Sequence, residues 1–294
     1  AHHPYRRLGS VRTESIQILP SEVMNPGVVS TFAISMAVAV CLTPVCGEAG
    51  EPQGDHRPAH VRVFSGVGVT GNSDVHIRQP TLGNNLTFAD VSWEHRSLST
   101  SWTRDSILYM GMRAGFFLSR VPWLGLSFEA VHFKILAETE NRVHVTGTVG
   151  HEPIDVIAPM ATFVEVYRVT NGVNLFLSNV QAHKGLIRSA RFPRGRVDLY
   201  GGVGGGVTMP YTSSVIAGER LGQYELGRFA TQVLAGFAWR ASPRWDVSLE
   251  YKFTATTVDG EVARGDSESR LHTNHLVVGL GFHVGSLRMG ERVS

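Results

Sequence analysis

Residues Trp245–Thr254 read WDVSLEYKFT, an alternation of apolar and polar side chains. Successive side chains of a β-strand point to opposite faces, so this run has one apolar face and one polar, charged face. A soluble sandwich or a lipocalin-like barrel would turn the apolar face inward, whereas a barrel in lipid would turn it outward. The rest of the sequence has to decide between these two orientations.

The same alternation recurs along the chain and predicts eight antiparallel strands. The change of phase near Ala130 and Val131 indicates a β-bulge in the third strand. Long connections follow every odd-numbered strand and shorter ones follow the even-numbered strands, which is typical of outer-membrane barrels with long external loops and short periplasmic turns. The expected strands are 60–70, 108–118, 123–136, 173–180, 196–209, 224–240, 245–254 and 270–284, and the long connections are 71–105, 137–172, 210–223 and 258–269.

Two features favour the outward orientation of the apolar face. Trp239 and Trp245 flank the turn at Pro243, where an interfacial aromatic girdle belongs. The opposite face carries glycines and charges of both signs, which would pair inside a narrow barrel where glycine leaves room for long side chains. The lipocalin-like alternative does not explain those glycines. The expected ion network of the lumen comprises Arg62, Arg113, Lys134, Asp198, Glu250 and Lys252.

The fold class predicted from these patterns is therefore all-β, an eight-stranded antiparallel transmembrane β-barrel over residues 60–285. Eight strands leave an interior that side chains fill, which argues against a general pore. A net charge of +2 and the lack of a Lys/Arg-rich block argue against a nucleic-acid partner. We expect a monomer whose partners are outer-membrane lipids, lipopolysaccharide and the barrel-assembly machinery.

The amino-terminal end resembles an export signal. Residues 28–45 are uncharged and largely apolar, and Val45-Cys46-Gly47 is a plausible cleavage site. We therefore expect a leader over 1–47, a linker over 48–59, a polar tail over 286–294, and Sec export to the bacterial outer membrane. A retained transmembrane anchor is the main alternative, although Pro44 interrupts the end of the run. A lipoprotein signal and twin-arginine export through Arg6-Arg7 fit the sequence less well.

Several sequence blocks resemble a family of small outer-membrane β-barrels that includes lipid A oxidases. These blocks are 86–93 (LTFADVSW), 129–134 (EAVHFK), 224–232 (YELGRFATQ), 250–254 (EYKFT) and 275–279 (HLVVG). The resemblance implies a barrel that uses oxygen to oxidise the proximal glucosamine of lipid A. The chain departs from the usual barrel pattern because its last strand does not end on an aromatic residue. The alternative is a non-catalytic structural or interaction barrel.

Oxidation by oxygen normally needs a metal or an organic cofactor, and no flavin or nicotinamide fingerprint is present. Imidazole and carboxylate groups suit a redox-active divalent metal, although a lumen ion network with solvated loop residues explains the same groups. The catalytic candidates are Asp90, Glu129, His132 and His275, and the metal-ligand candidates are Asp74, His76, Glu94, His95 and His272. The arginines expected to bind lipid A phosphates, for which a guanidinium is well suited, are Arg78, Arg96, Arg142, Arg220 and Arg270.

Overall fold

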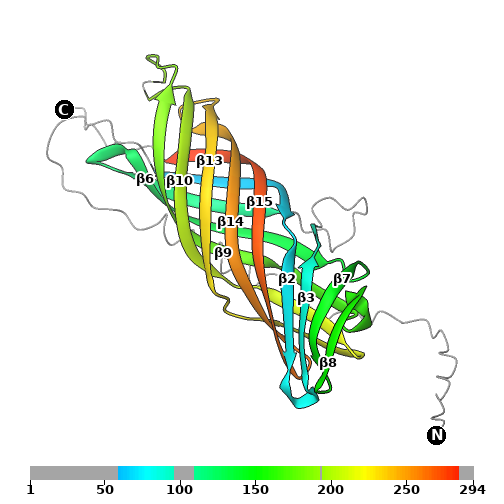
Figure 1. Ribbon diagram of the computed structural model, residues 1–294. Coiled ribbons are helices and arrows are strands. Elements are labelled where there is room, and N and C mark those ends of the chain that lie inside the picture. Colours follow the sequence, from blue (N-terminus) through cyan, green and yellow to red (C-terminus); the bar gives the residue numbers. More distant parts are fainter. Residues whose placement is uncertain (1–58, 96–108, 193, 285–294) are drawn as a thin grey trace, which may run out of the picture. The chain divides into compact units, whose positions relative to one another are not determined.

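The computed structural model describes residues 59–95, 109–192 and 194–284, which are almost entirely antiparallel β-strand without an α-helix (Figure 1). The prediction of an all-β, antiparallel chain is confirmed. Eight strands are each hydrogen-bonded to the next one in the sheet. The first of them also pairs with the last, so that the sheet closes on itself as a ring. In ring order these strands are β1 (Ala59–Thr70), β5 (Met110–Leu118), β6 (Val121–Ala137), β9 (Val166–Leu186), β10 (Val197–Thr208), β13 (Phe229–Arg240), β14 (Trp245–Val262) and β15 (Gly265–Val284).

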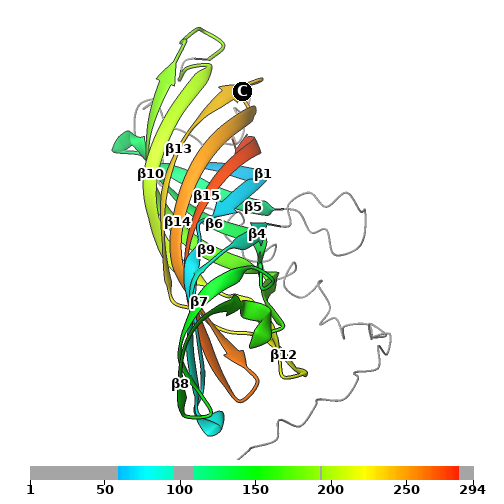
Figure 2. The same cartoon turned by 45° about the vertical axis from the view of Figure 1, so that its right-hand side comes forward.

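Short connections join ring strands at one end, which we call the turn end. At the other end the chain forms additional strands, which we call the extension; β7 and β8 lie there in both views (Figures 1 and 2). The β2–β3–β7–β8 sheet continues from β15, and β11 pairs with β9 and β12. The extension comprises β2 (Ser73–Gln79), η1 (Pro80–Leu82), β3 (Asn84–Val91), β4 (Trp93–His95), β7 (Arg142–Val149), β8 (Glu152–Pro159), η2 (Met160–Thr162), β11 (Tyr211–Ile216) and β12 (Glu219–Tyr224).

The long connections expected from the sequence are therefore largely strand. Residues 71–105 contain β2, β3 and β4, and residues 137–172 contain β7, β8 and the first part of β9. The 210–223 region is the β11–β12 hairpin, and β14 and β15 extend through 258–269 to a tight turn at Ala263-Arg264. Their apolar residues are too sparse to predict a strand in isolation, because each hairpin buries only part of one face in a shared core.

The ring exposes apolar side chains and buries polar ones. All eight ring strands carry exposed large apolar residues on the outer face, such as Val203 at 60% and Val278 at 56% exposure. Arg113, Glu129 and Lys252 lie inside the ring at 0–1% exposure. This is the reverse of a soluble protein, and it shows that the apolar face of WDVSLEYKFT points outward.

Beyond the ring, the outward side chains change from apolar to polar and the inward side chains change from polar to apolar. The alternation of inward and outward positions continues unbroken. In β14 the inward positions pass from Glu250 through Thr254 to Val258, while the outward positions pass from Leu249 to Asp259. In β15, which pairs with β14, the outward positions change from His272 and Asn274 to Leu276, Val278 and Leu280. One continuous hairpin thus has an apolar exterior within the ring and an apolar interior in the extension.

The same exchange explains the phase change that the sequence showed in the third strand. In β6, Glu129, Val131, Phe133 and Ile135 all face inward, and the pairing with β9 is continuous through Ala130. The predicted β-bulge at Ala130 is wrong. The inward side chains change there from polar to apolar, and this change looks like a phase slip in the sequence. The register shift in this pairing lies between Phe133 and Ile135.

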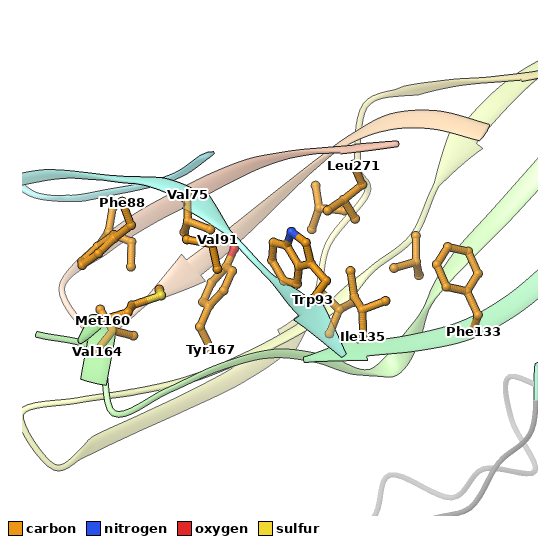
Figure 3. Close-up of a cluster of buried hydrophobic side chains, with 14 of the residues drawn as sticks. Val75, Phe88, Val91, Trp93, Phe133, Ile135, Met160, Val164, Tyr167 and Leu271 are labelled. Carbon is orange, nitrogen blue, oxygen red and sulfur yellow. The ribbon is translucent and has the colours of Figure 1, made fainter. Parts of the chain in front are cut away.

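A hydrophobic core fills the extension and continues into the adjoining part of the ring; part of it is shown in Figure 3. Val75, Phe88 and Met160 are fully buried there, and Trp93 packs against Tyr167 with ring centroids 6.1 Å apart. Burial of this apolar surface stabilises the hairpins as a folded unit instead of leaving them as separate loops.

The expected leader, the linker to residue 58 and the tail over 286–294 lie outside the described residues, so these boundaries stay predictions. None of the helical segments in the described part of the chain has the length and apolar character needed to cross a membrane.

Candidate functional site

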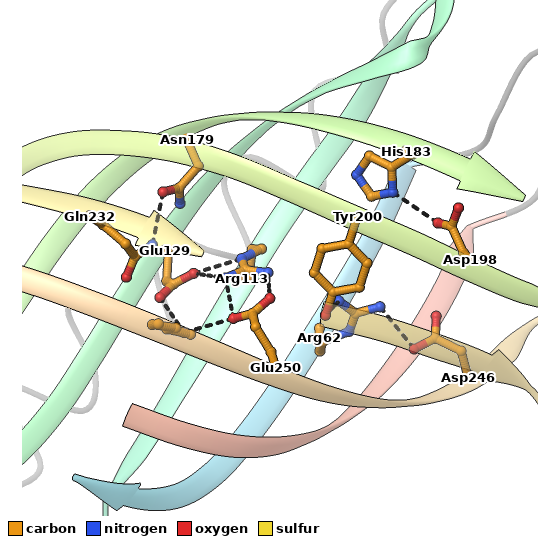
Figure 4. Close-up of polar contacts among 11 residues, drawn as sticks. Arg62, Arg113, Glu129, Asn179, His183, Asp198, Tyr200, Gln232, Asp246 and Glu250 are labelled. Carbon is orange, nitrogen blue, oxygen red and sulfur yellow. Dashed lines mark hydrogen bonds and ion pairs between the residues drawn. The ribbon is translucent and has the colours of Figure 1, made fainter. Parts of the chain in front are cut away.

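Four charged side chains form a buried ion cluster inside the ring (Figure 4). Arg113 on β5 donates to both carboxylate oxygens of Glu250 on β14, at 2.6 and 2.8 Å. Its Nε also donates to Glu129 on β6 at 2.6 Å. Lys252 Nζ lies 2.5 Å from Glu129 and 3.2 Å from Glu250, so two cations meet two anions. The cluster joins β5, β6 and β14 across the interior.

A second polar group lies between this cluster and the turn end. Arg62 on β1 donates to Asp246 at 2.9 Å and to the Tyr200 hydroxyl at 3.1 Å. His283 contacts the other oxygen of Asp246 at 2.5 Å. His183 and Asp198 form a neighbouring pair at 2.8 Å. Each charge inside the ring that is described here has a partner, as burial requires.

Glycines on the inner face leave the space that these side chains occupy. A Cβ at Gly281 would lie 2.5 Å from an Asp246 carboxylate oxygen, and one at Gly279 would lie 2.9 Å from Arg62 Cδ. Glycines and charged residues therefore share the inner face for a steric reason. The glycine of one strand makes room for the long side chain of the neighbouring strand.

The structure places five of the six residues expected in the lumen network inside the ring: Arg62, Arg113, Asp198, Glu250 and Lys252. Lys134 differs, because it is half-buried and lies on the opposite face of β6 from Glu129. The sequence pattern did not identify His183, His283 and Tyr200 as members of these groups. Their positions depend on the register of β9, β10 and β15, which the alternation alone does not fix.

The catalytic candidates do not form one site. Glu129 belongs to the buried ion cluster, and His275 is hydrogen-bonded to Thr254 at 2.8 Å. His132 lies on the outer side of β6 and contacts Asn174 at 2.8 Å. Asp90 is exposed in the extension, with a positive φ of 58°. Substrate in one position could not contact all four.

The metal-ligand candidates are only partly brought together. Asp74, His76 and His272 line a polar hollow of about 380 Å³ with Arg270 and Glu268. Glu94 and His95 lie on β4, where His95 contacts Thr70 at 2.6 Å. Over residues 59–95, 109–192 and 194–284, no group of three or more His, Cys, Asp or Glu side chains is arranged to hold a metal ion.

His95 is held as a neutral imidazole. Burial lowers its pKa to about 4, because desolvation disfavours the charged ring. Its ring stacks on Phe133 at 5.8 Å, and Phe133 contacts His275 and Tyr109 at 5.1 and 5.9 Å. These four rings, which we call the aromatic layer, include Tyr109 and Phe133 of the hydrophobic cluster that runs from the extension into the ring.

The arginines expected to bind phosphate lie on different strands of the extension. Arg78 is paired with Asp266 at 2.7 Å, and Arg142 donates to the Ile157 carbonyl at 2.8 Å. Arg220 lies exposed on β12, Arg270 lines the polar hollow, and Arg96 lies outside the described residues. Among the four arginines that the structure describes, Arg270 lines the polar hollow together with other candidates.

Comparisons with solved structures found weak likenesses, which define no family for this chain. Neisserial surface protein A has a TM-score of 0.37 and 9% identity, covering 77% of this chain and 97% of that one. Outer membrane protein AlkL has a TM-score of 0.37 and 12% identity over 83% and 98% of the two chains. Ail of Yersinia pestis has a TM-score of 0.32 and 8% identity over 78% and 99%. No family model and no curated protein matches the sequence.

Proposed function

We propose that this chain is a bacterial outer-membrane β-barrel whose ring sits in lipid and holds the extension outside as a non-catalytic binding module. The main support for the proposal is that the outward side chains of β14 and β15 change from apolar to polar along each strand. Exposed Leu276, Val278 and Leu280 give way to Asn274 and His272 on the same face of one strand. A surface that changes from apolar to polar along a continuous strand is expected where the strand leaves lipid for water.

The size of the apolar band supports a membrane location. On β15 the outward apolar positions run from Leu276 to Val284, nine residues, and a tilted transmembrane strand needs about 9–11. At the turn end, Trp123, Trp239 and Trp245 are exposed at 55%, 42% and 45%, respectively. Tryptophan is enriched at membrane interfaces because its ring is apolar and its N–H is polar.

A binding function is favoured over catalysis because the candidate catalytic residues do not lie together in one site. The ionisable side chains that do converge, around Arg113 and Asp246, are paired with one another inside the ring. Charged groups that are buried and paired with one another are not free to contact a substrate, because breaking a buried pair is costly.

The membrane proposal is tested by separating inner and outer membranes of expressing cells and by comparing boiled and unboiled protein on gels. We expect the chain in the outer-membrane fraction and a faster-migrating band without boiling. Recovery in the soluble periplasmic fraction with no heat-dependent shift would refute the membrane location.

Action on lipid A is a second candidate, which the polar hollow favours. The hollow is lined by Arg270 and His272 on the outer face of β15, directly beyond the apolar band that ends at Leu276. Lipid headgroups lie at this level if the ring is in the membrane. Mass spectrometry of lipid A from cells with and without the gene tests it: a mass change consistent with glucosamine oxidation supports the enzyme, and an identical profile excludes it.

A further inference from the structure

The extension contains an apolar cleft that is separate from the polar hollow. It has a volume of about 370 Å³, within the range of small-molecule sites. Leu86, Val164 and Ile216 form its floor as part of the buried core, and Leu82 and Val149 lie at its partly exposed wall. The cleft therefore opens the hydrophobic core of the extension to the outside.

The polar groups around the cleft are already satisfied by one another. Gln79, at 3% exposure, donates to the Ala263 carbonyl at 2.6 Å and accepts from Asn84 at 2.9 Å. Arg264 is ion-paired with Glu219. A ligand with its own hydrogen-bonding or charged head would have to displace these partners, whereas an apolar ligand would displace only water.

Tight hairpins hold the cleft open before any ligand binds. Ala217 and Gly218 form a two-residue turn between β11 and β12, with positive φ values of 51° and 77°. Arg264 also has a positive φ, 62°, in the β14–β15 turn. Two-residue turns of this kind fix the strands that they join, so little conformational entropy is lost when a ligand enters.

We propose that this cleft binds an uncharged alkyl chain, which deepens the proposed function by naming the ligand class of the binding module. The apolar floor supplies the contact area, and the Arg264–Glu219 pair leaves no net charge at the rim to attract a carboxylate. The proposal rests on the extension being outside the membrane, where an alkyl chain leaves water on entering the cleft.

The test uses the full chain in lipid nanodiscs with a long-chain alcohol that carries a photoreactive diazirine. After illumination, peptide mass spectrometry locates the label. We expect label on cleft peptides that contain Val164 or Ile216, and separately on outward ring peptides that contain Val278. Dodecanol should compete for the cleft more strongly than dodecanoate; equal competition by dodecanoate would overturn the assignment to an uncharged ligand.

Two matched variants make the result specific. Val149→Trp fills the wall of the cleft, whereas Ile157→Trp adds the same side chain on β8 at a position with 64% exposure that does not line the cleft. We expect at least a fivefold loss of cleft label in the first variant and none in the second, with ring label unchanged in both. Retained ring label shows that the ring of Val149→Trp has folded, and an unchanged far-UV circular dichroism spectrum shows that the strands of the extension are retained.

The two labelled regions separate the proposals. Ring label without cleft label overturns the alkyl site and leaves the membrane ring standing. Cleft label without ring label supports the site and contradicts the ring's position in lipid. Equal cleft label in the two tryptophan variants would show that the probe does not occupy this cleft.

Discussion

At the scale of single residues, the buried ion cluster makes Arg113 the most sensitive position in the ring. Arg113→Leu would leave Glu129 and Glu250 with only Lys252, and so one uncompensated negative charge in the interior. Removing one partner of a buried ion pair costs about 3–5 kcal/mol. We expect a loss of this size in the free energy of unfolding, measured by urea titration of the protein in lipid vesicles.

The control for this prediction restores the charge balance. In the double variant Arg113→Leu, Glu129→Leu, the remaining Lys252 and Glu250 are 3.2 Å apart and neutralise each other. The double variant should therefore be more stable than Arg113→Leu alone, which a double-mutant cycle measures directly. If the losses from the two single variants simply add, the cluster does not act through charge pairing.

The lowered pKa of His95 predicts that the stability of the extension depends on pH. Its pKa is lowered to about 4 in the folded chain, against about 6.5 when unfolded, so the unfolded state binds the proton first as pH falls. Its contribution is constant above pH 6.5 and becomes destabilising between pH 6.5 and 4, by roughly 3 kcal/mol at most. His95→Asn should flatten the plot of unfolding free energy against pH in this window. An unchanged slope in the variant would contradict the neutral, buried imidazole.

At the scale of the strand, the apolar outer face of β15 predicts opposite consequences for similar substitutions. Leu280, at 47% exposure, lies in the middle of the apolar band, and Ile157, at 64%, lies in the extension. Leu280→Arg should destabilise the membrane-inserted protein by about 2–4 kcal/mol, the cost of an arginine at mid-bilayer. Ile157→Arg should change stability by less than about 0.5 kcal/mol, as expected for a side chain in water.

Urea unfolding in vesicles compares the two arginine variants directly. Both replace an exposed aliphatic residue of a strand, so strand propensity and charge change alike. Equal effects would mean that the ring's apolar face does not contact lipid.

The strands that alternation predicted best are those in which each face has a uniform chemistry. The 60–70 and 245–254 predictions correspond closely to β1 and to the ring part of β14, because every second residue is apolar there. Prediction failed where the faces exchange roles, as at Ala130, and where hairpins of the extension bury residues in a core built from distant segments. For the candidate site, alternation assigned Arg113 and Glu250 to one face, but their contact depends on strand register across β1 and β15.

At the scale of the whole described unit, two groups of interacting side chains occupy the ring interior. The ion cluster around Arg113 and Glu250 bridges the ring strands, and the aromatic layer of His95, Tyr109, Phe133 and His275 follows it toward the extension. The first group is charged and tightly paired, and the second consists of four aromatic rings, two of them imidazoles. An ion would have to break a desolvated salt-bridge network and then lose its own hydration.

We therefore predict that the purified protein gives no stepwise ion conductance in planar lipid bilayers. A porin inserted from the same detergent serves as the positive control for the measurement. Arg113→Leu should also remain non-conducting, because the aromatic layer does not depend on the ion cluster. Current steps that increase in frequency with the amount of protein would show that the interior is open. Without conduction, the polar hollow and the apolar cleft of the extension would remain the sites proposed for ligand binding.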